Sequence, residues 1–111
     1  MRDGDLTLVY ATFPDIGVAE TIGASLVRQN LVACVNILPG MISIYRWEGA
    51  IERDAEVSML AKTRADLVEA VTAAIVAEHP YETPAVVAVP VSGGSGPFLD
   101  WIRAETGSAD E

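Results

Sequence analysis

The chain has 111 residues and a formal net charge of −9, and half of its residues are hydrophobic although only 6% are aromatic. A chain of this length folds as one domain and can bury a core without disulfides or metals. Its negative charge opposes contacts to nucleic-acid phosphates and docking on anionic membranes. We therefore expect one domain over residues 1–111, with an ordered core over about 6–105, and neither nucleic acid nor membrane as a partner.

Targeting features and cysteine content bear on the compartment. The chain begins without a basic segment followed by an apolar one, and its longest apolar stretches are too short to span a bilayer. Cys34 is the only cysteine, so no disulfide can form within the chain. These features predict a cytoplasmic protein.

The first elements are a strand and a helix. Leu6 to Phe13 is an apolar run rich in strand-forming residues. Pro14 and Asp15 follow, and we expect a helix to begin there with Thr12 or Asp15 as its cap. Apolar residues then recur every three or four positions, and Asn30 indicates where the helix stops.

A long hairpin follows the helix. One strand begins near Leu31 and continues to about Trp47, with a bulge or bend expected at Pro39-Gly40 because proline cannot donate to a ladder. Glu48-Gly49 is a tight-turn signal, and Ile51 to Lys62 returns as the second strand. The hairpin is longer than a small sheet needs, and its outer edges would be prone to aggregation if left open. The hairpin and the surplus of apolar residues therefore predict a buried interface between subunits.

A second helix and a fourth strand complete the pattern. Thr63 to Asp66 has the form of a capping box, and the helix that follows should end at His79-Pro80. Pro84 to Val91 is an apolar strand, and Pro90 predicts that its end lies at an edge or bulge. The glycine-rich stretch 93–96 is a flexible connector.

The chain order predicts the fold class. Pro97 suits the first turn of a short terminal helix, and the tail after Thr106 is expected to fray. The order β-α-β-β-α-β plus a short C-terminal helix is that of an α+β ferredoxin-like sandwich, an antiparallel sheet with helices on one face. A doubly wound parallel sheet would need a helix between the second and third strands, where the sequence offers only a turn.

Several unusual short motifs occur in matching order and spacing along the chain. They are LVACVNILPG at 31–40, SIYRWEG at 43–49, Glu56-Val57 with Lys62-Thr63, HPYETP at 79–84 and LDW at 99–101. By these motifs the chain resembles the CutA family of divalent-cation tolerance proteins, from Leu6 to about Arg103.

The resemblance implies a ferredoxin-like protomer that assembles as a homotrimer through its long hairpins. It also implies a role in tolerance to divalent cations and an association with copper. The fold and trimer are similar to those of the PII-like signalling proteins, which bind nucleotides between subunits. The alternative function is therefore a PII-like sensor of a small ligand, or a scaffold for a protein partner, that uses the cleft between subunits.

The chain departs from the common family pattern at four positions. Ala85 stands where many members have Glu, which removes a carboxylate from the cleft region, and Phe98 stands where Tyr is common. Ala11 and Glu78 replace a Cys and a second His that some members carry. These last two differences weaken a copper site carried over from the family.

The candidate metal ligands are His79, Glu78, Glu82 and Cys34. His79 is the only histidine, and an imidazole suits Cu(II), with Glu78 or Glu82 placed to add an oxygen. The alternative is a helix-terminal His79 that donates to backbone carbonyls and helps to end the helix. Cys34 could bind Cu(I), but it lies in an apolar run where a buried thiol is expected. We expect Cu(II) or another divalent cation as cofactor, bound with modest affinity, and no organic cofactor.

Two further groups of residues carry expectations about the contacts that they make. Tyr45 and Trp47 near the hairpin tip are expected to pack a subunit interface. Glu56 and Lys62 are expected to form an ion pair, on the surface or in a cleft.

The motifs of common enzyme classes are missing from the sequence. The glycine cluster at 93–96 lacks the Lys-Ser/Thr of a P-loop, and no nucleophile elbow frames a serine. One Cys and one His cannot make zinc-type spacing. We expect a binding protein and not an enzyme.

Overall fold

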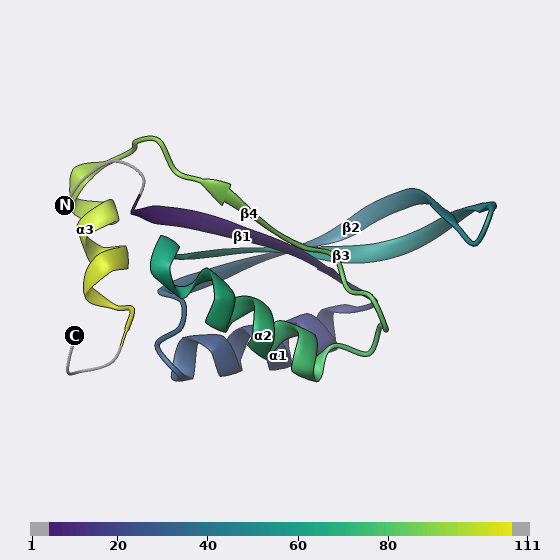
Figure 1. Cartoon of the computed structure of the whole chain (residues 1–111), viewed down its shortest axis with the longest axis horizontal. Coiled ribbons are helices and arrows are strands. Elements are labelled where there is room, and N and C mark those ends of the chain that lie inside the picture. The colour runs from purple at the N-terminus through teal and green to yellow at the C-terminus, as the bar shows by residue number, and fades with distance from the viewer. Residues whose placement is uncertain (1–4, 108–111) are drawn as a thin grey trace.

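Four antiparallel strands form one sheet in the order β2-β3-β1-β4, with α1 and α2 on the same side of it (Figure 1). The computed structural model describes residues 5–107. The elements in chain order are β1 (Leu6–Phe13), α1 (Ile16–Arg28), β2 (Cys34–Trp47), β3 (Ala50–Arg64), the 3₁₀ turn η1 (Ala65–Leu67), α2 (Val68–Glu78), β4 (Val86–Pro90) and α3 (Gly96–Ala104). The α+β ferredoxin-like fold predicted from the sequence is confirmed.

The hydrophobic core lies between the sheet and the two helices. Alternate side chains of the two central strands point toward the helices, as the period of a strand requires. The buried members of this core are Val9, Ala11 and Phe13 of β1, Val57, Met59 and Ala61 of β3, Ala19, Ile22 and Leu26 of α1, Val32, and Val71 and Ile75 of α2. A Cβ at Gly23 would lie 3.0 Å from Val35 Cγ2 and 3.1 Å from Met59 Cε, so α1 lies directly on the sheet there.

The opposite face of the sheet is free of helices, and we call it the open face. It carries the intervening side chains of the sheet, among them Tyr10 of β1, Leu38 of β2 and Leu60 of β3. Val87 and Val89 of β4 pair with Tyr10 and Leu8, and both valines are exposed, Val87 at 55%. The sheet therefore presents uncovered apolar surface on this side.

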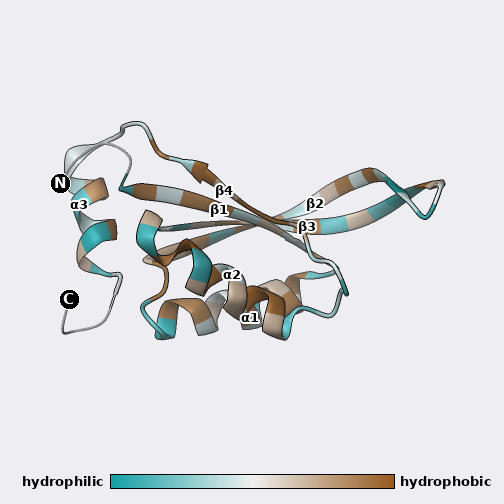
Figure 2. Cartoon of the chain, in the orientation of Figure 1, coloured by the Kyte–Doolittle hydropathy of each residue, from teal (hydrophilic) through white to brown (hydrophobic). Residues whose placement is uncertain are grey.

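The hairpin of β2 and β3 extends as an arm past the helices (Figure 1). Its register is shifted between Leu38 and Met41, and Gly40 has a φ of +83° there, so the predicted bulge is confirmed. Glu48 and Gly49 both have positive φ and close the arm with a two-residue turn. In Figure 2 polar and apolar residues alternate along the arm. Its exposed apolar residues include Ile42, Ile44 and Ile51.

The first helix begins and ends as predicted, with Asp15 rather than Thr12 as its cap. Asp15 Oδ1 accepts a hydrogen bond from Val18 N at 2.9 Å, while Thr12 lies inside β1. The helix ends at Arg28, and Asn30 takes a positive φ. The next strand begins at Cys34 instead of Leu31, because Leu31 still bonds through its backbone to α1.

The predicted capping box at Thr63 to Asp66 is wrong. Thr63 is a fully buried residue of β3, and its hydroxyl donates to the carbonyl oxygen of Leu31 at 2.6 Å. No side chain caps α2, which begins at Val68 after η1. The Thr63 hydroxyl donates to the carbonyl of Leu31, which lies outside the sheet, so it cannot also cap α2.

The C-terminal helix α3 packs at the end of the sheet opposite to the arm (Figure 1). Helix α3 has Pro97 in its first turn, and its Ile102 forms a small second core with Leu6 and Ala33. The fourth strand is an edge strand, two residues shorter at its start than predicted and ending at Pro90. The tail after Thr106 lies outside the described residues from position 108 on. No helix among those described has the length and apolar character needed to cross a membrane.

Candidate functional site

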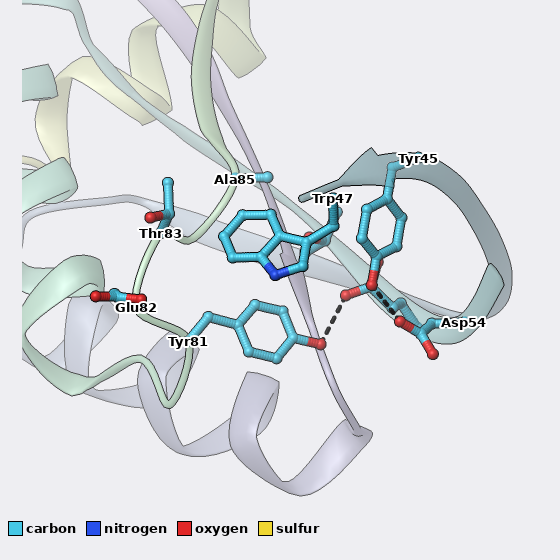
Figure 3. Close-up of a pocket in the computed structure, with 9 residues that line it drawn as sticks. Tyr45, Trp47, Asp54, Tyr81, Glu82, Thr83 and Ala85 are labelled. Atoms are coloured by element: carbon cyan, nitrogen blue, oxygen red, sulfur yellow. Dashed lines mark hydrogen bonds between the residues drawn. The ribbon is translucent and has the colours of Figure 1, made fainter. Parts of the chain in front are cut away.

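A cavity of about 450 Å³ lies between the arm and the connection from α2 to β4, and we call it the Glu56 pocket (Figure 3). Its lining comes from three strands and from the connection between α2 and β4. The lining residues are Thr12, Tyr45, Trp47, Asp54, Glu56, Tyr81, Glu82, Thr83 and Ala85. Segments far apart in the sequence thus meet at one point of the open face.

Strand geometry places the acidic residues of the pocket. Asp54 and Glu56 are two residues apart on β3, so both project from the face opposite to the buried Val57. Tyr45 lies diagonally across from Asp54 in the register of β2 and β3. The local sequence therefore brings an aromatic ring and two carboxylates to the same face.

Each of these carboxylates accepts a hydrogen bond from a tyrosine. Tyr81 Oη donates to Glu56 Oε2 at 2.7 Å, and Tyr45 Oη donates to Asp54 Oδ2. The two bonds are the dashed lines of Figure 3. They fix the orientation of the carboxylates and leave other lone pairs free to accept from a ligand.

The same bonds hold the tyrosine protons in place. The hydrogen bond to Asp54, followed by desolvation, raises the pKa of Tyr45 to about 12. Burial, followed by the hydrogen bond to Glu56, raises the pKa of Tyr81 well above its usual value. Both phenols are therefore neutral donors at physiological pH.

Glu56 is a buried charge without a cationic partner. Its residue is only 9% exposed, and no Lys or Arg among residues 5–107 forms an ion pair with it. The predicted pairing with Lys62 is wrong, because the two residues lie on one strand roughly 20 Å apart. A carboxylate in this setting is destabilising unless a cation reaches it. The pocket is therefore poised to attract positive charge.

His79 lies at the end of α2 and uses both of its ring nitrogens. Nε2 is 2.7 Å from the carbonyl oxygen of Thr12, and Nδ1 accepts a hydrogen bond from Tyr81 N at 3.1 Å. Since a carbonyl can only accept, Nε2 carries the proton. The ring is buried and stacks on Phe13 with 4.9 Å between centroids. This arrangement supports the role of a histidine at a helix end and positions Tyr81 for its bond to Glu56.

The four ligands predicted from the sequence do not converge in this structure. Glu78 is exposed at the end of α2, while Glu82 is exposed and lines the Glu56 pocket. Cys34 pairs with Lys62, roughly 13 Å along the sheet from the level at which His79 contacts Thr12. Among the described residues no three His, Cys, Asp or Glu side chains form a group that could hold a metal ion. Copper binding through His79 stays a prediction that a titration must test.

Sequence reasoning missed Asp54 and Tyr81 as site residues and gave Glu56 the wrong partner. One available signal was the alternation of Glu52, Asp54 and Glu56, which places three acids on one face. No local sequence pattern indicates that the 81–85 connection returns to the sheet. In the structure His79, directly before this connection, contacts Thr12 of β1.

Comparison with known proteins identifies relatives along almost the whole chain. The family model described as CutA1 divalent ion tolerance protein matches residues 7–105. Protein CutA of Homo sapiens is 42% identical over 108 residues, which are 97% of this chain and 60% of that protein. The divalent-cation tolerance protein CutA of Thermus thermophilus is 43% identical over 100 residues, 90% of this chain and 97% of that protein.

A solved structure supports the same relationship. The crystal structure of CutA from Xylella fastidiosa superposes with a TM-score of 0.90 at 44% identity, covering 93% of this chain and 99% of that one. The chain spans only 60% of the human relative and 54% of the chloroplastic CutA of Arabidopsis thaliana. The family model nevertheless covers the sheet, all three helices and the Glu56 pocket. The chain belongs to the CutA1 divalent ion tolerance protein family.

Proposed function

We propose that this protein acts in tolerance to divalent cations by binding cations at the Glu56 pocket, as a homotrimer in the cytoplasm and without catalysing a reaction. Its relatives carry divalent-cation tolerance in their names. The observation that carries the proposal is the buried Glu56 carboxylate, which has no cationic partner in the described part of the chain. A bound cation would supply that partner.

The oxygen donors of the pocket suit a divalent cation with modest affinity. Asp54 and Glu56 offer carboxylate oxygens, and such hard donors are the ligands that divalent cations share. Two carboxylates alone are a sparse ligand set, so water would have to fill the remaining positions. Tight and selective binding of copper is not what this geometry favours.

The open face and the arm support the homotrimer. Val87 and Val89 on the open face and Ile44 and Ile51 on the arm are large apolar residues that are exposed in the single chain, and exposed apolar surface of this kind marks interaction sites. Both outer strands, β2 and β4, have an unpaired edge. Contact between copies would cover this surface and these edges. Light scattering should return about three times the chain mass of 11.8 kDa, and a monomer mass at micromolar concentration would overturn the trimer.

The pocket chemistry favours binding over catalysis. The tyrosine protons are committed to Asp54 and Glu56, and the raised pKa values of Tyr45 and Tyr81 make these phenols poor general bases. The lining offers no Ser, Cys, Lys or His, and the hydroxyls of Thr12 and Thr83 therefore have no imidazole or amine within it to activate them. A carboxylate held by a phenol is instead a fixed acceptor for a ligand.

Calorimetric titration with Cu(II) tests the proposal and separates it from a site at His79. The titration compares the natural chain with Glu56→Gln and His79→Ala, and circular dichroism checks that each variant is folded. We expect Glu56→Gln to lower the affinity by about tenfold, because it removes the buried charge and little volume. Binding that is kept in Glu56→Gln and lost in His79→Ala would overturn the pocket and return the site to His79.

A further inference from the structure

The lining of the Glu56 pocket is acidic without compensation. Asp54, Glu56 and Glu82 contribute carboxylates to it, and none of its lining residues is Lys or Arg. Glu56 is nine-tenths buried, and its side-chain partner is the neutral phenol of Tyr81. Such a pocket repels the phosphates of a nucleotide and attracts a cation.

Aromatic rings form much of the remaining wall. Tyr45 and Trp47 from β2 and Tyr81 from the connection before β4 project into the pocket (Figure 3). In the single chain Trp47 is 46% exposed, and its ring lines the pocket. The face of an indole or phenol attracts a cation, and most strongly one that is weakly hydrated. A divalent metal ion that keeps its hydration shell gains little from such a wall.

Ala85 adds an apolar contact to the pocket. It is the last residue of the 81–85 connection, and its methyl group lines the pocket (Figure 3). The pocket thus offers apolar surface for the body of an organic ligand.

We propose that the Glu56 pocket binds a small organic cation that carries N–H donors on an apolar body, as a primary alkylammonium or alkylguanidinium ion does. The inference rests on the proposed cation site at Glu56, and it adds an organic cation to the divalent ions proposed for that site. Glu56 supplies the balancing charge, and the free lone pairs of Glu56 and Asp54 accept from the N–H groups. The aromatic faces and Ala85 contact the apolar body, and 450 Å³ is a volume typical of small-molecule pockets.

Tyr81 and His79 act as positioning residues in this arrangement. Tyr81 holds the Glu56 carboxylate through its phenol, and the backbone N–H of Tyr81 donates to His79. His79 in turn bonds to Thr12 of β1. The end of α2 thus fixes the direction of the charge that the ligand meets.

Fluorescence of Trp47 tests the inference. The chain has two tryptophans, so a Trp101→Phe background leaves Trp47 as the only reporter. The probe is n-butylammonium chloride at constant ionic strength, and n-butanol is the neutral control of similar shape. We expect a saturable change with the ammonium ion and none with the alcohol.

Matched variants locate the site. Glu56→Gln should weaken n-butylammonium binding by about tenfold and Asp54→Asn by less, because Asp54 is more exposed. Glu52→Gln is the control, since Glu52 is an exposed acid of the same strand that does not line the pocket. Ala85→Glu should shift the ratio of the two affinities from n-butylammonium toward Cu(II). Circular dichroism and light scattering of each variant exclude loss of fold or assembly.

The outcomes separate this inference from the proposed function. No saturable response to n-butylammonium, combined with Cu(II) binding that still depends on Glu56, would overturn the organic cation and leave the cation site in place. No Glu56-dependent binding of either cation would overturn both. An equal response to n-butylammonium and n-butanol would overturn the role of charge.

Discussion

The two faces of β3 carry opposite chemistry although their residues alternate along one strand. Val57, Met59 and Ala61 point toward the helices and are buried in the core. Asp54 and Glu56 point to the open face and line a pocket. The strand therefore divides its side chains between stability on one face and recognition on the other.

Buried polar groups have hydrogen-bond partners on both faces, but the open face also carries a charge without a countercharge. No buried side-chain nitrogen or oxygen among the described residues lacks a hydrogen-bond partner. On the covered face the fully buried Thr63 is neutral and bonds to Leu31. On the open face Glu56 brings a charge that its phenol partner does not neutralise. A satisfied hydrogen bond and a compensated charge are therefore separate conditions.

The largest effect is expected on the covered face. Met59→Ala removes a fully buried side chain between the sheet and α1, and should lower the free energy of unfolding by about 3 kcal/mol. Chemical denaturation measures this change. Glu52→Gln on the other face should stay within about 0.5 kcal/mol of the natural chain. Similar losses in the two variants would remove the distinction between the faces.

A smaller loss is expected at the polar residue of the covered face. Thr63→Val keeps the shape of the side chain and deletes the hydroxyl that bonds to the Leu31 carbonyl. Leaving that carbonyl unpaired should lower the free energy of unfolding by about 1 to 2 kcal/mol. Thr83→Val, at an exposed position, is the control in the same denaturation experiment. Equal stability of Thr63→Val and the natural chain would show that water replaces the hydroxyl.

The hydrogen bonds of Tyr45 and Tyr81 on the open face should be detectable in an alkaline titration. The pKa of Tyr45 is raised to about 12 and that of Tyr81 is raised further, while both ionise near 10 when the chain is unfolded. The folded chain holds these protons more tightly, so the stabilisation is complete below pH 10 and is lost as the pH rises from there toward 12. Asp54→Asn should move Tyr45 toward its ordinary pKa in an absorbance titration. If the pKa of Tyr45 stayed raised in Asp54→Asn, the hydrogen bond to Asp54 could not be its cause.

Much of the fold could be predicted from the sequence, because it depends on local features that only a few residue types can form. The turn at Glu48-Gly49, the bulge at Pro39-Gly40 and the cap at Asp15 each need a particular residue type, so the sequence indicates them directly. The capping box failed because Thr63 satisfies a distant carbonyl. A local motif cannot show which distant group competes for a hydroxyl.

The site was harder to predict because it is assembled from distant segments. Glu56 and Tyr81 are 25 residues apart, and they meet only because the 81–85 connection returns across the sheet. The lone histidine drew attention as a ligand, yet its two nitrogens serve the backbone of Thr12 and Tyr81. Residue types identify candidate chemistry, while the fold decides which lone pairs are free.

Thermal unfolding can show whether Glu56 binds the cation. The natural chain and Glu56→Gln are compared with and without n-butylammonium chloride or copper(II) sulfate, at constant ionic strength. Without a cation, Glu56→Gln should melt at or above the temperature of the natural chain, because it removes a buried uncompensated charge and keeps an acceptor for Tyr81. With a cation, the melting temperature of the natural chain should rise and that of the variant should not. Two results together would show that Glu56 is not the cation site. The variant would melt at a lower temperature than the natural chain without a cation, and a cation would raise its melting temperature by as much as that of the natural chain.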